Sequence, residues 1–208
     1  MNILGVVGGI GSGKSLVTQL LAQSRGAVRL DADRIGHEVL RQPAVKEAIY
    51  ARFGDAVFDP AFELSDEINR RKLAAVVFSL TEQGADGLAF LNNLTHPRIT
   101  EEFRRTLAEL EYQRVSRVVL DAPLLFEARW NEFTTGVIFV DAPEPVRWNR
   151  CEQRGWSRAE FLAREAAQWP TGKKREHADY ILPNAGTLAD LENEVRKFPG
   201  SLSPNFGF

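Results

Sequence analysis

The sequence predicts an α/β fold in which a parallel sheet of about five strands is flanked by helices. Short apolar runs alternate along the chain with stretches of helical periodicity, which is the pattern that repeated βα units produce. The runs expected to form strands are 3–7, 27–30, 115–120, 137–140 and 180–182. Several of them end at an acidic or polar residue. Ligands of open α/β sheets collect at that carboxyl edge, so we expect a binding site there.

The stretches between these runs carry helix signals. The first predicted helix follows residues 3–7, and its apolar face would hold Leu16, Val17, Leu20 and Leu21. Pro97 suits the first position of a second helix, because apolar residues recur at helical spacing over 99–110. Residues 157–160 and 187–190 each begin with Ser or Thr and end with an acid, which is typical of a helix N-terminal cap.

Two stretches interrupt the strand–helix rhythm and predict helical insertions. Residues 36–94 would form a mostly helical insertion, and the Arg-rich residues 143–168 would form a smaller helical insertion, a candidate lid. The α/β core would then comprise 1–35, 95–142 and 169–208.

Composition excludes several classes of protein. The 208 residues include 26 Lys and Arg against 28 Asp and Glu, so no overall basic excess favours a nucleic-acid or membrane partner. The single Cys cannot form a disulfide within the chain. No apolar run approaches the roughly 20 residues of a membrane span. The apolar run at the start of the sequence is too short for a signal peptide, and no basic residues precede it. We expect a cytoplasmic protein, monomeric or a small homo-oligomer.

The most specific motif is Gly-Gly-Ile-Gly-Ser-Gly-Lys-Ser at residues 8–15, which satisfies G-x-x-x-x-G-K-[ST]. Successive backbone N–H groups of such a loop point at one anion, and the following helix adds its positive end. Lys14 should reach the outer phosphates of ATP, and the Ser15 hydroxyl should ligate Mg²⁺. An ordinary Gly-rich turn is the alternative, but the position between a strand and a helix favours phosphate binding. The expected ATP contacts are Gly9, Ile10, Gly11, Ser12, Gly13, Lys14, Ser15 and Leu16.

Two acids follow the second apolar run. Alternation along an extended chain would put the carboxylates of Asp31 and Asp33 on the same side, beside the phosphate loop. Asp31 is then a further candidate for the Mg²⁺ site, and Asp33 could accept the proton of an attacking hydroxyl. A helix cap with a surface turn accounts for the same two residues equally well.

Arginines gather in the predicted lid. Arg147, Arg150 and Arg154 fall at i, i+3 and i+7 and so share one helical face, and Arg164 follows on the next helix. A closing lid of this kind would place positive charge over a migrating phosphoryl group and exclude water. The alternative is a solvated face whose arginines pair with Glu144, Glu152 and Glu160.

Further short motifs extend the pattern over most of the chain. They are Leu91-Asn92, Thr95-His96-Pro97, residues 123–127 (Pro-Leu-Leu-Phe-Glu), Arg164 with Gln168, Ala178-Asp179 and Asn184. With the glycine loop, Asp31-Ala32-Asp33, Arg150 and Arg154, their order and spacing resemble the dephospho-CoA kinase family. Three positions depart from the family's usual residues. Leu16 stands where the family usually has Thr, His37 where it often has Arg, and Arg147 where Gln is usual. Asp121 resembles a Walker-B acid, and its part in a metal site stays open.

This resemblance implies a fold like that of nucleoside monophosphate kinases. In it the α/β core (1–35, 95–142 and 169–208) would bind the nucleotide, residues 36–94 would form a helical domain that binds CoA as substrate, and residues 143–168 would form the lid. The implied reaction is ATP-dependent, Mg²⁺-assisted phosphorylation of the ribose 3′-hydroxyl of dephospho-CoA, which gives coenzyme A and ADP. The implied catalytic residues are Lys14, Asp33 and Arg150. Arg150 and Asn184 would also contact ATP, with Asn184 near the adenine. The implied acceptor contacts are Asp33, His96, Pro97, Leu124 and Glu127.

Plainer interpretations stand beside these roles. His96 could cap the helix that Pro97 begins, and residues 124–126 could be ordinary core. Another small-metabolite or nucleotide P-loop kinase would share the phosphate loop and the lid arginines. A regulatory module that hydrolyses nucleotide slowly is disfavoured, because no Asp-x-x-Gly follows the third run and no Asn-Lys-x-Asp occurs.

Overall fold

The computed structural model describes residues 1–58, 68–79 and 81–199 of the chain. The chain divides into two compact units, which are described one after the other. Unit 1 comprises residues 1–32 and 106–208, and unit 2 comprises residues 33–105.

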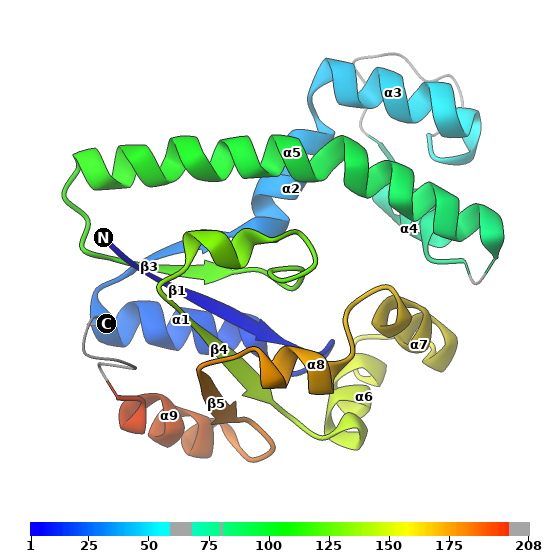
Figure 1. Ribbon diagram of the computed structural model, residues 1–208. Coiled ribbons are helices and arrows are strands. Elements are labelled where there is room, and N and C mark those ends of the chain that lie inside the picture. The colour runs from blue at the N-terminus through cyan, green and yellow to red at the C-terminus, as the bar shows by residue number, and fades with distance from the viewer. Residues whose placement is uncertain (59–67, 80, 200–208) are drawn as a thin grey trace. The chain divides into compact units, whose positions relative to one another are not determined.

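Unit 1 is built on a parallel sheet of five strands in the order β2-β3-β1-β4-β5 (Figure 1). The strands are β1 (Asn2–Gly8), β2 (Val28–Asp31), β3 (Arg117–Asp121), β4 (Gly136–Asp141) and β5 (Tyr180–Pro183). Each predicted strand is confirmed, and no end differs from the prediction by more than two residues. In register, Asp31 of β2 lies opposite Asp121 of β3, so two acids end adjacent strands at the carboxyl edge.

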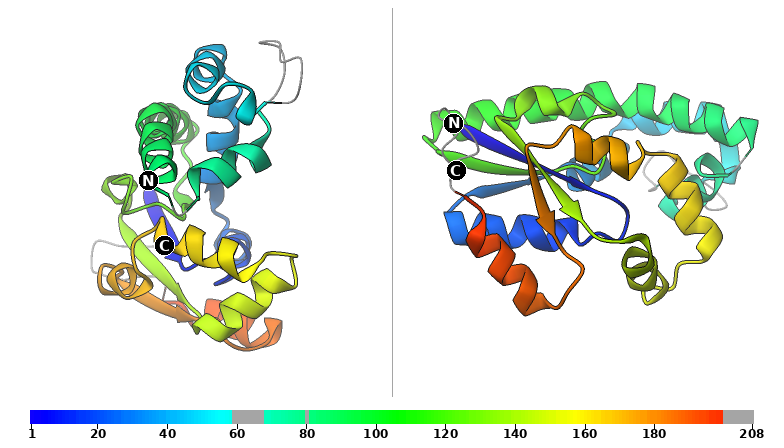
Figure 2. Two further views of the ribbon diagram at one scale, coloured as in Figure 1. Left: turned by 90° about the vertical axis from the view of Figure 1, so that its right-hand side faces the viewer. Right: turned by 60° about the horizontal axis from the view of Figure 1, so that its bottom comes forward.

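Helices complete unit 1. They are α1 (Lys14–Arg25), the 3-10 helix η2 (Trp130–Phe133), α6 (Glu144–Glu152), α7 (Arg158–Ala166), α8 (Thr171–Glu176) and α9 (Leu188–Lys197). The right view of Figure 2 shows α1 in blue and α9 in red on the same face of the strands. The predicted caps of α7 and α9 are confirmed, since Ser157 Oγ accepts from the N–H of Glu160 and Thr187 and Asp190 form a reciprocal capping box.

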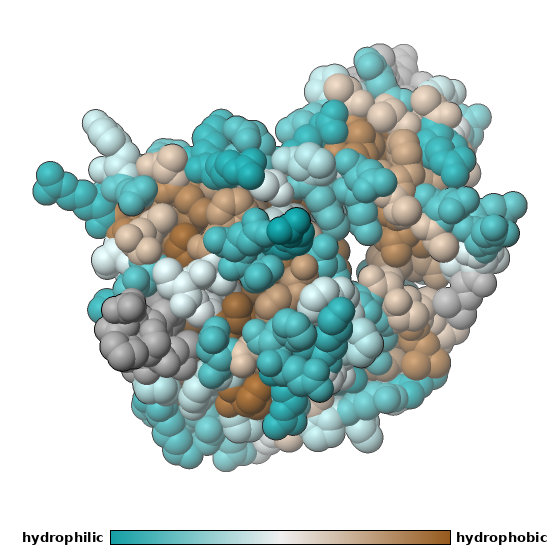
Figure 3. Space-filling view, viewed as in Figure 1, coloured by the Kyte–Doolittle hydropathy of each residue, from teal (hydrophilic) through white to brown (hydrophobic). Residues whose placement is uncertain are grey.

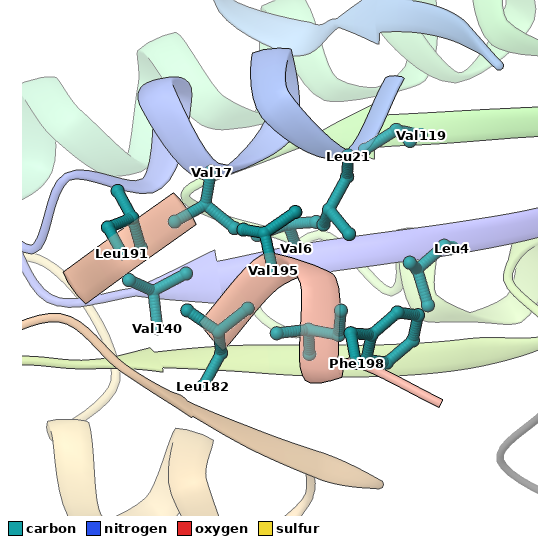
Figure 4. Packing of buried hydrophobic residues seen from close by; sticks show 11 residues of the cluster. Leu4, Val6, Val17, Leu21, Val119, Val140, Leu182, Leu191, Val195 and Phe198 are labelled. Carbon is teal, nitrogen blue, oxygen red and sulfur yellow. The ribbon is translucent and has the colours of Figure 1, made fainter. Parts of the chain in front are cut away.

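The core between the sheet and these two helices consists of aliphatic side chains and one aromatic ring, that of Phe198 (Figure 4). Val17 and Leu21 of α1 are fully buried there beside Val195 of α9, as their spacing predicts. The prediction for Leu16 is wrong, because its side chain is 40% exposed. Leu16 is one residue from Val17, about 100° further around the helix, so it falls outside the buried face.

The described residues of unit 2 are helical for most of their length. The elements are α2 (Ala32–Leu40), α3 (Pro43–Phe53), the 3-10 helix η1 (Gly54–Ala56), α4 (Arg70–Val77) and α5 (Glu82–Tyr112). α2 begins one residue before the unit, and α5 continues beyond it. Within the expected helical stretch 36–94, residues 59–67 and 80 lie outside the described part of the chain.

Pro97 does not begin a helix, which corrects the sequence prediction. It lies inside α5, a continuous helix of 31 residues. A proline removes one backbone donor, and three neighbouring side chains bond to carbonyls around it. Thr95 Oγ1 donates to Leu91 O at 2.8 Å, Arg98 Nη1 to Leu94 O at 2.6 Å, and Thr100 Oγ1 to His96 O at 2.8 Å. The buried face that continues through Ile99, Phe103 and Leu107 stabilises the helix on the far side of the proline.

No helix among the described residues is long and apolar enough to cross a membrane. Figure 3 shows that hydrophilic residues cover much of the face seen in Figure 1, with smaller apolar areas between them.

Candidate active site

The loop between β1 and α1 has a backbone that only glycine allows at two positions. Gly11 has φ 75° and Gly13 has φ 87°, which lie in the left-handed region. A Cβ on Gly11 would be 2.3 Å from the carbonyl oxygen of Arg147, and one on Gly13 would be 2.3 Å from Nδ2 of Asn184. α1 begins at Lys14 directly after the loop, so the positive end of the helix adjoins it. The predicted phosphate cradle therefore has both its tight turn and its helix.

The other predicted members of the loop differ in exposure. The N–H of Ser12 donates to Gly9 O at 3.0 Å, and the Ser12 hydroxyl is buried without a hydrogen-bond partner among the described residues. Ser15 is exposed in the first turn of α1, where its hydroxyl is accessible to a ligand. Ile10 contributes its carbonyl to a bond from Arg147, at 3.1 Å.

Lys14 is paired with Asp121, the last residue of β3. Asp121 is 2% exposed, and its other carboxylate oxygen accepts from Thr18 Oγ1 at 3.0 Å and from Arg29 Nη2 at 2.6 Å. Arg29 also bonds Asp31 at 2.9 Å, so the second candidate acid is engaged with a cation too. Sequence reasoning did not single out Arg29, since an Arg at a strand edge is usually solvated.

Burial by itself would raise the pKa of Asp121, but Lys14 and then Arg29 outweigh it and hold the pKa below its ordinary 3.8. A carboxyl group whose folded-state pKa is lowered stabilises the fold above its unfolded pKa, and this is lost as the pH falls through the folded value. Asp121 is therefore ionised at neutral pH, and its contribution to stability falls only in acid below 3.8.

Arg147 is buried and bonded on three sides, in contrast to the exposed cation that its helical spacing predicts. It is 5% exposed, forms an ion pair with Glu165, and donates to the carbonyls of Ala142 and Ile10 at 3.1 Å each. Arg147 thus ties the glycine loop to α6 and α7. Its partner Glu165 lies 18 residues away and was not among the acids considered from sequence.

Arg150 and Asn184 hold the backbone of the glycine loop. Arg150 Nη1 donates to Ser12 O at 3.2 Å, and its Nη2 donates to Asn184 O at 3.0 Å. Asn184 is 5% exposed and donates from Nδ2 to the same Ser12 carbonyl at 2.7 Å. The structure therefore brings together these two predicted ATP contacts and the loop.

Arg154 lies just past the end of α6, near Arg150. Burial and then the charge of Arg154 hold the pKa of Arg150 below its usual value. Two guanidinium groups that repel each other beside a phosphate-type loop favour an anion between or beneath them.

Glu127 belongs to a buried network behind the loop that follows β3. Its Oε1 accepts from the N–H of Trp169 at 2.7 Å and pairs with Lys174 Nζ at 2.9 Å. Lys174 also donates to Pro123 O at 2.7 Å and to Gln168 Oε1 at 2.9 Å, which uses all three of its N–H donors. Lys174 was missed from sequence because it lies among charged residues, a context typical of a solvated surface.

The three apolar residues before Glu127, residues 124–126, differ in burial. Leu125 is fully buried and Phe126 is 8% exposed, so these two are ordinary core, while Leu124 is half-buried. Phe126 stacks on Trp169 with ring centroids 5.7 Å apart, which fixes the segment that carries Gln168.

The Glu127–Lys174 pair makes a testable prediction on stability. Lys174→Met should lower the free energy of unfolding by about 3–5 kcal/mol, because it leaves a buried carboxylate without its cation. Adding Glu127→Gln should recover most of that loss, since no buried charge then remains. Denaturant unfolding of the two single variants and the double variant measures both effects. Equal stability of Lys174→Met and the unchanged protein would contradict the pairing.

In unit 2, Asp33 lies exposed in the first turn of α2. The predicted alternation does not apply, because β2 ends at Asp31 and the helix has begun by Ala32. His96 and Pro97 lie on the interior turns of α5.

Unit 2 also contains a cavity of about 190 Å³ at the end of α2, lined by Arg34, His37, Glu38, Leu40, Arg41, Ile68 and Arg70. Arg70 Nη1 lies 2.9 Å from His37 Nε2. Three arginines and one acid give the lining a positive balance.

No group of three His, Cys, Asp or Glu side chains converges to hold a metal ion in residues 1–58, 68–79 and 81–199. Asp31 and Asp121 already face cations from the protein itself. A divalent ion at the glycine loop would therefore depend on Ser15 and on oxygens of a bound ligand.

Comparison with known proteins gives one consistent family. The family model described as dephospho-CoA kinase matches residues 2–190. A dephospho-CoA kinase of Carboxydothermus hydrogenoformans is 36% identical over 196 residues, which is 93% of this chain and 90% of the relative.

Solved structures agree with the sequence relatives. The dephospho-CoA kinase of Campylobacter jejuni has a TM-score of 0.65 and 27% identity, over 94% of each chain. A Thermus thermophilus protein has a TM-score of 0.71 and 37% identity, over 94% of this chain and 95% of that one. With a family model that spans most of the residues and a relative that matches nearly end to end, the chain belongs to the dephospho-CoA kinase family.

Proposed function

We propose that this protein transfers the terminal phosphate of ATP to the ribose 3′-hydroxyl of dephospho-CoA, with coenzyme A and ADP as products. The observation that carries the proposal is the glycine loop between β1 and α1, with its left-handed Gly11 and Gly13, in a member of this family. Backbone N–H groups of the loop and the positive end of α1 are suited to bind phosphate oxygens. Lys14 adds a charge that reaches the outer phosphates.

The base of ATP would lie near Asn184, and its phosphates would extend along residues 9–16. Support comes from Arg150 and Asn184, which both bond the Ser12 carbonyl and so shape the loop. On closure of a lid formed by residues 143–168, Arg150 would turn from these carbonyls to the phosphates. The negative charge that develops there attracts a guanidinium more strongly than a neutral carbonyl does.

Mg²⁺ fits this arrangement through Ser15, whose hydroxyl is exposed at the start of α1. Mg²⁺ usually keeps several waters and takes few ligands from the protein, so one hydroxyl with phosphate oxygens is sufficient. Its chemistry would be to neutralise charge on the outer phosphates. Asp31 is a weaker candidate than the sequence implied, because Arg29 already bonds it.

The acceptor would be bound by residues 36–94 as a substrate domain, together with Asp33, His96, Pro97, Leu124 and Glu127. Glu127 Oε2 is buried without a hydrogen-bond partner among the described residues, so it is suited to accept a bond from a ligand hydroxyl or amine. The positive cavity lined by Arg41 and Arg70 is suited to the acceptor's pyrophosphate. Asp33 would accept the proton of the attacking 3′-hydroxyl.

An assay of ADP release tests the function directly. Turnover is expected with dephospho-CoA and not with nucleosides or nucleoside monophosphates, when each is supplied with ATP and Mg²⁺. Turnover with a different small acceptor would favour another metabolite kinase. ATP hydrolysis at the same rate with and without any acceptor would favour a regulatory module.

Arg150→Ala should lower kcat by about a hundredfold or more, because a guanidinium on transferring phosphate stabilises the transition state by orders of magnitude. Steady-state rates with saturating substrates measure this effect. Arg158→Ala is a matched control on α7, since Arg158 pairs with Glu144 and has no bond to the glycine loop among the described contacts. An unchanged kcat for Arg150→Ala would leave Arg150 with a role in loop structure alone.

We further propose that the protein acts in the cytoplasm as a monomer or small homo-oligomer, with ATP and dephospho-CoA as its partners.

A further inference from the structure

Asp121 has two cations on a single buried carboxylate. Lys14 bonds Oδ1, whereas Arg29 bonds Oδ2 at 2.6 Å, beside the hydroxyl of Thr18 at 3.0 Å. The side chain of Asp121 is 2% exposed, so water cannot replace either partner freely. The Asp121 carboxylate therefore has a cation on each oxygen, one of which, Arg29, it shares with Asp31.

Lys14 is the partner that has to be shared. Under the proposed function its ammonium group contacts the outer phosphates of ATP, which carry more negative charge than Asp121. Any movement toward the phosphates weakens the bond to Asp121. A buried carboxylate left without a cation strongly opposes such a movement, because its desolvation is no longer compensated.

Arg29 is placed to remain when Lys14 moves. It holds the other carboxylate oxygen, so the two cations do not compete for one acceptor. Its position is fixed by the sheet, since Arg29 and Asp31 lie on one face of β2 and Asp31 is in register with Asp121. The Arg29–Asp31 bond of 2.9 Å holds the guanidinium at this edge.

We infer that Arg29 is a positioning residue for nucleotide binding, which keeps Asp121 neutralised and so releases Lys14 to the phosphates. The inference rests on the ATP half of the proposed function and is independent of the acceptor. Arg29 need not touch the nucleotide. The alternative is an ordinary strand-edge ion pair with Asp31, which would contribute little.

Calorimetric titration with Mg·ATP, without an acceptor, tests the inference on the full chain. Arg29→Met should raise the Kd for ATP by about tenfold, because Lys14 is then retained by Asp121. Arg29→Lys, which keeps a cation, should recover part of the loss. Arg117→Met is the matched control, since Arg117 is an exposed Arg at the other end of β3 and bonds only Arg25 O among the described contacts.

A second background separates this role from a general loss of structure. In Asp121→Asn there is no buried charge to compensate, so adding Arg29→Met should change the Kd by less than about twofold. The role of Arg29 would be overturned if Arg29→Met raised the Kd for ATP equally in both backgrounds, or if it left the Kd unchanged in the wild-type background. Binding of ATP by the unchanged protein would still support the proposed function in either case. If the unchanged protein bound no ATP, the proposed function would fall and this inference with it.

Discussion

Lys14→Ala is expected to lower kcat/KM for ATP by about 10²–10³-fold, since the variant removes the cation that neutralises the outer phosphates during transfer. The ammonium group of Lys14 stabilises both the ground state and the transition state. Its removal should raise the energy of the transition state more, because negative charge develops on the leaving oxygen of ADP as the bond to the terminal phosphorus breaks. The measurement is initial ADP release with ATP varied at saturating dephospho-CoA.

The fold should survive this change. Asp121 keeps Arg29 and Thr18 when Lys14 is removed, so its charge is not left uncompensated. A thermal melt close to that of the unchanged protein is therefore expected. Lys197→Ala serves as the control, because Lys197 is an exposed residue of α9 that pairs with Glu194. A Lys14→Ala enzyme with kcat/KM near the wild-type value would exclude the phosphate role.

Asp33→Asn is expected to lower kcat by about 10²–10⁴-fold while the KM for ATP changes only a few-fold. The amide keeps the size and much of the hydrogen bonding of the carboxylate but cannot accept the proton of the 3′-hydroxyl. Binding of ATP precedes that step and does not need it. Steady-state kinetics with each substrate varied in turn separates the two effects.

Asp55→Asn provides a close comparison for Asp33→Asn. Asp55 is also an exposed acid in the first turn of a helix of unit 2, the 3-10 helix η1, and has no assigned role. The Asp55→Asn enzyme should have the wild-type kcat. If Asp33→Asn did the same, the base would have to be a different group, and Asp33 would be only a residue of the helix start.

The sheet and the glycine loop could be predicted because both depend on local sequence. The three central strands, β1, β3 and β4, are short runs that are buried along most of their length, which leaves an apolar signal in the sequence itself. The loop depends on positive φ angles at positions 11 and 13, which glycine adopts without strain. Local rules failed where packing or neighbouring side chains override them. Pro97 stays inside α5, where a buried face that continues through Ile99 and Phe103 stabilises the helix beyond the proline.

The sequence predicts which residues belong to the candidate site, but not which of them bond to one another. Arg147 and Arg150 were predicted together from their spacing on a helix. Spacing does not show that Arg147 is buried against Glu165, whereas Arg150 bonds the glycine loop. Nor does a run of charged residues show which lysine, here Lys174, turns inward.

The sequence alone determined the α/β fold, the phosphate loop and the resemblance to dephospho-CoA kinases, since each is set by residues close together in the chain or by motifs in order. Only the tertiary structure decided the partners of the buried charges. Lys14 and Asp121 are 107 residues apart, and Arg147 bonds a carbonyl 137 residues away. A charged side chain can be buried only where a distant strand or loop supplies its counter-charge, and hydrophobic periodicity carries no information about that partner.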